Sequence, residues 1–271
     1  MSKGITILIL IISLNNIISG QIIDTLIDAG GYDLHFNIKH DSGLPIIFES
    51  GAGDDGGIWK NITNALDTLI DATLITYDRS GFGKSGYLDD DLNIKQEIIG
   101  LENSLRKLGY LKPCILVAHS YGGFCALLFA ARNHELTKGY VAIDANLPCT
   151  FHKGRVDLVY QQFDPIRDSL KAANIGLYNL MLSMREDVEI MNNIDLNANL
   201  PIFDIVAEYQ YYDSILTLDC HKKFCDISPD RELITATDCN HYIFFDNPQL
   251  IIEKIIEMYT KQKNNVKINE W

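Results

Sequence analysis

The sequence has few basic residues relative to acidic ones, and this shortage argues against one class of partner. Its 271 residues include 23 Lys and Arg against 36 Asp and Glu, which gives a formal net charge of −13. Binding to nucleic-acid phosphates needs clustered positive charge, so no nucleic-acid partner is expected. With 47% hydrophobic and 22% charged residues, the composition is typical of a folded chain with a large core.

The sequence also lacks a hydrophobic run long enough for a clear membrane span. The most apolar stretch, Ile5 to Leu14, falls short of the roughly 20 residues that cross a bilayer. Lys3 precedes it and small residues follow it, so residues 1–20 resemble a secretory signal peptide. We therefore expect a secreted, lumenal or periplasmic protein whose mature chain spans 21–271 and has no stable membrane span. A retained N-terminal anchor, or an extra strand or helix, is the alternative.

No internal repeat is present, and the motifs for bound cofactors are incomplete. Gly51 to Gly56 matches a dinucleotide-binding fingerprint, but its two aspartates would repel a pyrophosphate. The run 83–85 lacks the earlier glycine of a phosphate loop, because Asp78 stands at that position. The cysteines and histidines from Cys220 to His241 do not have zinc-finger spacing. We therefore expect no cofactor and no metal.

One short run carries the strongest chemical signal in the chain. The apolar residues Cys114 to Ala118 predict a buried strand, and Phe124 to Arg132 predict a helix. Ser120 lies in the sharp turn between them, where the backbone is strained and the residues two positions away, Ala118 and Gly122, must be small. A serine oxygen held at the carboxyl edge of a sheet is typical of a nucleophile elbow. An incidental serine in a glycine-rich turn is the alternative.

Short apolar segments alternate with amphipathic ones along most of the chain, which predicts a mostly parallel sheet flanked by helices. Strands are expected near Ile22 and at 32–38, 45–49, 72–77, 114–118, 138–144, 202–207 and 232–237, and helices at 58–69, 94–108, 124–132 and 248–261. Residues 146–200 interrupt this alternation and have helical apolar spacing, which predicts a helical insertion there. The polar tail from Gln262 is expected to fray.

Four motifs, in this order along the chain, resemble those of the α/β-hydrolase fold family. They are the strand and oxyanion loop at 44–53, the Asp-Arg-x-Gly-x-Gly-x-Ser strand end at 73–85, the elbow at 118–122 and the histidine loop with the start of the last helix at 240–248. Ala118 stands where the usual elbow has its first glycine. The resemblance implies an α/β fold with a mostly parallel central sheet, flanking helices and a helical cap.

A serine hydroxyl is a poor nucleophile and needs a base and a site for the developing negative charge. The resemblance implies His241, which follows the last expected strand, as the base for Ser120. His221 is the alternative base, and it is expected to be a surface histidine if it has no such role. The backbone N–H groups of Tyr121 and Ala52 are the expected oxyanion hole.

The sequence offers several candidates for the acid that orients the base. Asp144 ends the expected strand 138–144 and would lie at the carboxyl edge of the sheet, as the acid does in some relatives. Asp213 follows the next strand, but its turn matches the more common Gly-x-x-Asp pattern poorly. We favour Asp144, with Asp213 and then Glu208 as alternatives.

These residues predict a serine hydrolase that cleaves an ester, thioester or amide of a small molecule through an acyl-enzyme. A ligand-binding or sensing member of the same fold, with weak or no turnover, is the alternative. Oligomeric state and substrate identity do not follow from the sequence.

Six cysteines are compatible with an oxidising compartment. The two beside the elbow, Cys114 and Cys125, are expected to be buried thiols. One disulfide is expected among Cys220, Cys225 and Cys239, with Cys149 as an alternative partner.

The signal-peptide interpretation makes a direct prediction about the N-terminus. Protein released by its native host is expected to begin near Gln21, because the small residues before it provide a cleavage site. Edman sequencing or intact-mass analysis of that protein measures the new terminus. An intact Met1 on protein recovered from inside the cell would contradict the targeting interpretation.

Overall fold

The computed structural model describes residues 21–88, 92–151, 153–208 and 214–269. The expected signal peptide, residues 1–20, and the alternative acid Asp213 lie outside this range. Among the described residues, no helix is long and apolar enough to cross a membrane.

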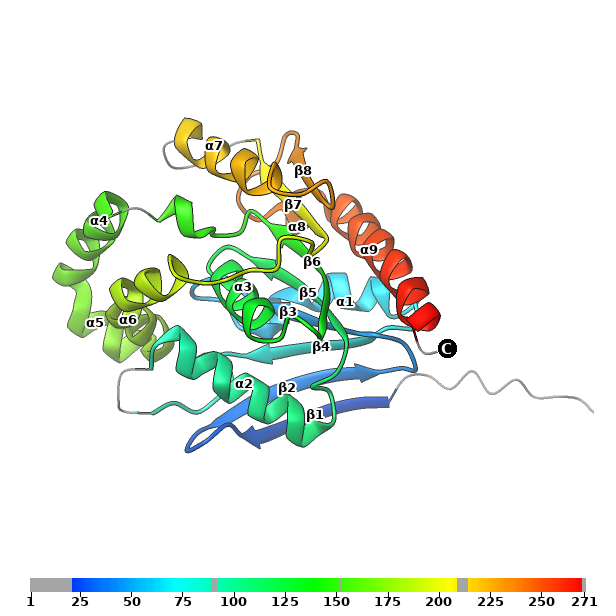
Figure 1. Cartoon of the computed structure of the whole chain (residues 1–271). Coiled ribbons are helices and arrows are strands. Elements are labelled where there is room, and N and C mark those ends of the chain that lie inside the picture. The colour runs from blue at the N-terminus through cyan, green and yellow to red at the C-terminus, as the bar shows by residue number, and fades with distance from the viewer. Residues whose placement is uncertain (1–20, 89–91, 152, 209–213, 270–271) are drawn as a thin grey trace, which may run out of the picture.

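A single sheet of eight strands forms the centre of the described structure (Figure 1). The strands are β1 (Gln21–Asp28), β2 (Asp33–His40), β3 (Pro45–Glu49), β4 (Thr73–Asp78), β5 (Cys114–His119), β6 (Thr137–Ile143), β7 (Ile202–Ala207) and β8 (Arg231–Ala236). Their order across the sheet is β1-β2-β4-β3-β5-β6-β7-β8. Only the pairings of β2 with β1 and β4 are antiparallel, and the remaining pairings are parallel, as the sequence predicts.

Helices cover both faces of this sheet. The helices outside the cap are α1 (Lys60–Leu66), α2 (Ile94–Leu108), α3 (Gly122–Arg132), α7 (Ser214–Cys225), α8 (Ile243–Asp246) and α9 (Pro248–Asn269). Apolar side chains of α2 and α3 form one core with one face of the sheet, and those of α1, α8 and α9 form a second core with the other face. β3, β4, β5 and β7 are buried along their whole length, and apolar residues make up most of β3, β5 and β7.

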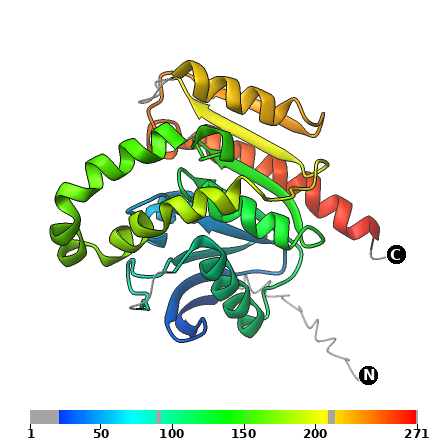
Figure 2. The ribbon, with the colours of Figure 1, turned by 60° about the vertical axis from the view of Figure 1, so that its left-hand side comes forward.

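The segment between β6 and β7 is helical, in the region 146–200 where the sequence predicts a cap. It contains α4 (Lys153–Phe163), α5 (Arg167–Ala173) and α6 (Ile175–Met191), with short 3-10 turns at Pro148–Thr150 and Asp164–Ile166. Figure 2 shows these helices extending as an arm at one side of the sheet. The arm returns toward the main body where α6 packs on α2.

Two parts of the structure differ from the sequence-based expectation. Helix α7, between β7 and β8, was not predicted, because its polar and apolar residues do not recur with a clear helical period. Helix α9 continues to Asn269 instead of fraying from Gln262. Gln262 is buried, and Lys263 Nζ donates to Asp71 Oδ1 at 2.6 Å outside the helix, so tertiary contacts extend the helix through a polar sequence.

Candidate active site

Ser120 lies between the end of β5 and the start of α3, and its backbone is left-handed with φ of 53°. That conformation is uncommon for a residue with a side chain and costs energy, so the surrounding structure must hold it. Gly122 shows how tightly the turn is packed, because a Cβ atom there would lie 2.7 Å from the carbonyl oxygens of Glu49 and Ser50. The strand-to-helix turn predicted around Ser120 is therefore present, with its side chain at the carboxyl edge of the sheet.

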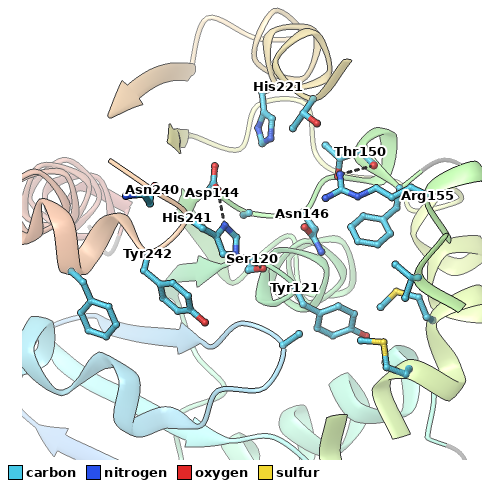
Figure 3. Close-up of a pocket in the computed structure, with 18 of the residues that line it drawn as sticks. Ser120, Tyr121, Asp144, Asn146, Thr150, Arg155, His221, Asn240, His241 and Tyr242 are labelled. Carbon is cyan, nitrogen blue, oxygen red and sulfur yellow. Dashed lines mark hydrogen bonds and ion pairs between the residues drawn. The ribbon is translucent and has the colours of Figure 1, made fainter. Parts of the chain in front are cut away.

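His241 follows β8 and joins Ser120 to Asp144 through two short hydrogen bonds (Figure 3). Its Nε2 lies 3.0 Å from Ser120 Oγ, and its Nδ1 lies 2.6 Å from Asp144 Oδ2. A carboxylate only accepts hydrogen bonds, so the proton of neutral His241 is on Nδ1 and Nε2 accepts from the serine hydroxyl. The three residues chosen from the sequence thus form one continuous chain of hydrogen bonds.

Asp144 is fixed by the neighbouring strand as well as by His241. It follows β6 in a left-handed conformation with φ of 42°. Its N–H donates to the carbonyl of Ile205 at 2.7 Å, and its Oδ1 accepts the N–H of Ala207 at 3.0 Å. One carboxylate oxygen is thereby held by β7, while the other faces the imidazole of His241.

The alternative residues that the structure describes occupy other positions. The carboxylate of Glu208 is exposed and accepts the N–H of Asp238 at 2.8 Å. His221 does not contact Ser120, because its Nδ1 pairs with Asp204 Oδ2 at 2.7 Å on the other side of the pocket. The alternative interpretation of His221 as a surface residue is also wrong, since it is only 2% exposed.

His119, which directly precedes the serine, holds the loop that carries His241. Its Nε2 donates to the backbone carbonyl of His241 at 3.0 Å, and the two imidazole rings lie 4.5 Å apart. Burial, together with the nearby His241, lowers the pKa of His119 to about 3, so its ring is neutral at physiological pH. His119 is therefore a positioning residue for His241.

The buried cation Arg79 shapes the loop that carries Ala52. Its guanidinium donates to the carbonyl of Gly51 at 2.7 Å and to the carbonyl of Ser50. With these two carbonyls turned toward Arg79, Ala52 lies at the wall of the pocket, as does Tyr121 at the start of α3. Neither N–H has a hydrogen-bond acceptor within the part of the chain that the structure describes. The strand-end motif at 73–85 contains Arg79, but sequence reasoning gave it no role.

A second buried charged group, Asp187 on α6, was not anticipated from the sequence. Its carboxylate accepts hydrogen bonds from Tyr121 Oη at 2.9 Å, Ser183 Oγ at 2.7 Å and the N–H of Ile94 at 2.8 Å. Tyr121 is the residue next to Ser120, and Ile94 begins α2. Asp187 therefore connects the helical arm to the elbow and to the main body.

These elements enclose a pocket of about 630 Å³ over Ser120. Its polar lining includes Asn146, Thr150, Arg155, Thr217, His221 and Asn240, and its apolar lining includes Phe151, Val159, Met181, Met184 and Phe245. The volume suits a small organic molecule. No cluster of three or more His, Cys, Asp or Glu side chains that could hold a metal ion occurs in the described ranges.

The cysteines form one disulfide in the described structure, between Cys149 and Cys220, whose Cα atoms are 5.8 Å apart. Cys149, the alternative partner in the sequence, is therefore the one that pairs. Cys225 and Cys239 are buried free thiols, as are the two beside the elbow.

Comparison with known sequences identifies the family. The sequence model of the alpha/beta hydrolase family matches residues 46–254, which is more than half of the chain. The chain therefore belongs to the alpha/beta hydrolase family. It is also 26% identical over 238 residues to the uncharacterized protein YqjL of Bacillus subtilis, an alignment that covers 82% of this chain and 85% of that protein.

Solved structures of the same fold include enzymes with different chemistry. A thermophilic esterase from Thermogutta terrifontis superposes with a TM-score of 0.69 at 17% identity, covering 90% of this chain and 99% of the esterase. A mutant epoxide hydrolase from Vigna radiata superposes with a TM-score of 0.74 at 13% identity, and the match covers 89% of this chain and 99% of the epoxide hydrolase. These similarities confirm the α/β-hydrolase fold, and the family supports hydrolytic chemistry at the site.

The buried carboxyl of Asp187 leads to a pH prediction. Burial raises its pKa from 3.8 to about 6, so between about pH 4 and about pH 6 the folded chain holds a proton that the unfolded chain releases. The contribution of Asp187 to stability therefore falls as pH rises through this window. In urea unfolding, wild type is expected to lose stability relative to Asp187→Asn between about pH 4 and about pH 7. Asp168→Asn, at an exposed position on α5, is the control, and a pH-independent difference for Asp187→Asn would contradict the prediction.

Proposed function

We propose that this protein is a serine hydrolase in which Ser120, His241 and Asp144 act as a Ser–His–Asp triad. The observation that carries the proposal is the pair of hydrogen bonds at His241, 3.0 Å to Ser120 Oγ and 2.6 Å to Asp144 Oδ2. A nucleophile within hydrogen-bond reach of a base, with the base oriented by a carboxylate, is the arrangement that activates a serine hydroxyl.

The proposed reaction begins with attack of Ser120 Oγ on the substrate carbonyl carbon, while His241 Nε2 takes the hydroxyl proton. The N–H groups of Tyr121 and Ala52 stabilise the negative oxygen of the tetrahedral intermediate. Collapse of that intermediate breaks the bond to the leaving group, which receives the proton from His241, and an acyl-enzyme remains. Water then attacks the acyl carbon with His241 again as base, which releases the acid and restores Ser120.

The substrate class in this proposal is a small ester, with thioesters and amides as related carbonyl substrates. A serine at the elbow favours attack on a carbonyl, and a pocket of about 630 Å³ suits a small substrate. A ligand-binding protein with little turnover would keep the same fold, and measuring the reactivity of Ser120 separates the two.

We also propose that the protein acts outside the cytoplasm or in a membrane-enclosed compartment. The sequence of residues 1–20 supports this, and the Cys149–Cys220 disulfide agrees with an oxidising environment.

The first test replaces the nucleophile. Ser120→Ala is expected to lower kcat/KM for short p-nitrophenyl esters by roughly 10⁶-fold, because no group remains to form the acyl-enzyme. Labelling by a fluorophosphonate probe is expected to disappear in the same variant. Circular dichroism checks that the variant is folded. Turnover equal to wild type in a folded Ser120→Ala protein would rule out the proposed nucleophile.

The second test addresses the acid. Asp144→Asn is expected to reduce kcat/KM about 10⁴-fold, since an amide donates to Nδ1 and favours the wrong imidazole tautomer. Glu208→Gln and Asp213→Asn are matched controls at the alternative positions and should retain most activity. If Asp213→Asn inactivates the enzyme while Asp144→Asn does not, the assignment of Asp144 is wrong.

A further inference from the structure

A second His–Asp pair faces the pocket and has no part in the proposed reaction. His221 on α7 pairs through Nδ1 with Asp204 Oδ2 on β7 at 2.7 Å, and the two side chains are 2% and 0% exposed. The other ring nitrogen, Nε2, has no hydrogen-bond partner among the described residues, while His221 lines the pocket that contains Ser120. Figure 3 shows the ring of His221 directed into this pocket.

Such a pair is difficult to explain by stability alone. Removing a carboxylate and an imidazole from water is costly, and a well-packed apolar pair often stabilises a fold as well or better. Asp204 is also incompletely satisfied, because its Oδ1 is buried without a hydrogen-bond partner in the described structure. A buried, oriented titratable pair at the wall of a cavity is a candidate for a functional site.

The cation Arg155 lines the same pocket and is close along the chain to one end of the disulfide. Cys220 precedes His221 and is bonded to Cys149, which precedes Thr150. The carbonyl of Thr150 accepts a hydrogen bond from Arg155 Nη1 at 3.0 Å. The guanidinium also lies 4.6 Å from the centroid of the Phe151 ring. Arg155 and His221 therefore line one pocket (Figure 3). The chain segments that carry them are joined by the Cys149–Cys220 disulfide.

We propose that His221 and Arg155 form a subsite for a carboxylate on the substrate, an inference that rests on the proposed serine hydrolase. On binding of a carboxylate, His221 takes up a proton at Nε2, and the imidazolium then donates one N–H to Asp204 and the other to the ligand, so its charge lies between two carboxylates. Arg155 supplies a planar cation that matches a carboxylate.

The other acidic groups that the described residues contribute to the pocket make hydrogen bonds away from this subsite. Asp144 pairs with His241, and Asp246 accepts the N–H of Asn240 at 2.8 Å. The lining of the same pocket also includes the apolar side chains of Met181, Met184 and Val159. The inferred substrate is therefore a small ester whose acyl or alcohol part has a short apolar chain and a terminal carboxylate.

The test compares matched anionic and neutral substrates. Mono-p-nitrophenyl adipate and its methyl ester place the charge on the acyl part, and 4-acetoxybutanoate and its methyl ester place it on the alcohol part. Wild type is expected to show a kcat/KM ratio of roughly 10- to 100-fold in favour of the anion in one of the two pairs, from charge-assisted hydrogen bonds. A ratio near one in both pairs, or a preference for the neutral ester, would overturn the subsite.

Variants assign the preference to these side chains. His221→Asn and Arg155→Gln are each expected to bring the ratio to within a few-fold of one. His134→Asn and Arg106→Gln, both away from the pocket, are matched controls that keep the wild-type ratio. A wild-type ratio in both His221→Asn and Arg155→Gln would overturn the assignment. If His221→Asn does not fold, the wild-type ratio and Arg155→Gln still decide the question.

A binding measurement separates this inference from the proposed reaction. Calorimetric titration of Ser120→Ala with mono-p-nitrophenyl adipate and with its methyl ester reports the subsite without turnover. Tighter binding of the anion, lost in the double variant with Arg155→Gln, supports the subsite even if fluorophosphonate labelling shows that Ser120 is not a nucleophile. Equal binding of both esters overturns the subsite while leaving the proposed triad intact.

Discussion

The left-handed turn at Ser120 is the constraint on which the arrangement of the site depends. A side chain in this backbone conformation costs about 1 kcal/mol or more, and it persists only where the surroundings hold it. Here Gly122 packs against the carbonyls at the end of β3, and the N–H of Asn146 donates to the carbonyl of Ser120 at 2.8 Å. The turn thus packs against the loop that carries Ala52 and is hydrogen-bonded to the loop that carries Asp144. Moving either loop would move the serine with it.

The site is tied to the fold by groups buried on either side of this turn. On one side, Arg79 holds the carbonyls of Ser50 and Gly51, and its guanidinium lies 5.3 Å from the centroid of the Tyr121 ring. On the other side, the hydroxyl of Tyr121 donates to Asp187 on the helical arm. The side chain of Tyr121 therefore contacts both Arg79, which holds the loop before Ala52, and Asp187 on α6. Tyr121 itself lies at the elbow and lines the pocket.

Much of this arrangement could be predicted because the information is local in the sequence. Ser120 is marked by its small neighbours and by an apolar run followed by a helical one, and Asp144 is marked by its place at the end of a strand. The pairs Asp187–Tyr121 and Asp204–His221 could not be predicted, because each joins residues on separate elements that meet only in the folded chain. Helix α7 and the extension of α9 were missed for the same reason, since tertiary packing overrode weak local patterns.

The position of Asp144 directly after β6 has a consequence for how this chain can vary. Because the carboxylate beside His241 follows β6, the turn that follows β7 does not have to supply one. Selection on which ligands bind can therefore act on α7 without changing Ser120, His241 or Asp144, whereas β7 holds Asp144 through Ile205 and Ala207. Substitutions in α7, which contributes Thr217 and His221 to the pocket, would change which molecules bind there. They would leave the hydrogen bonds among Ser120, His241 and Asp144 in place.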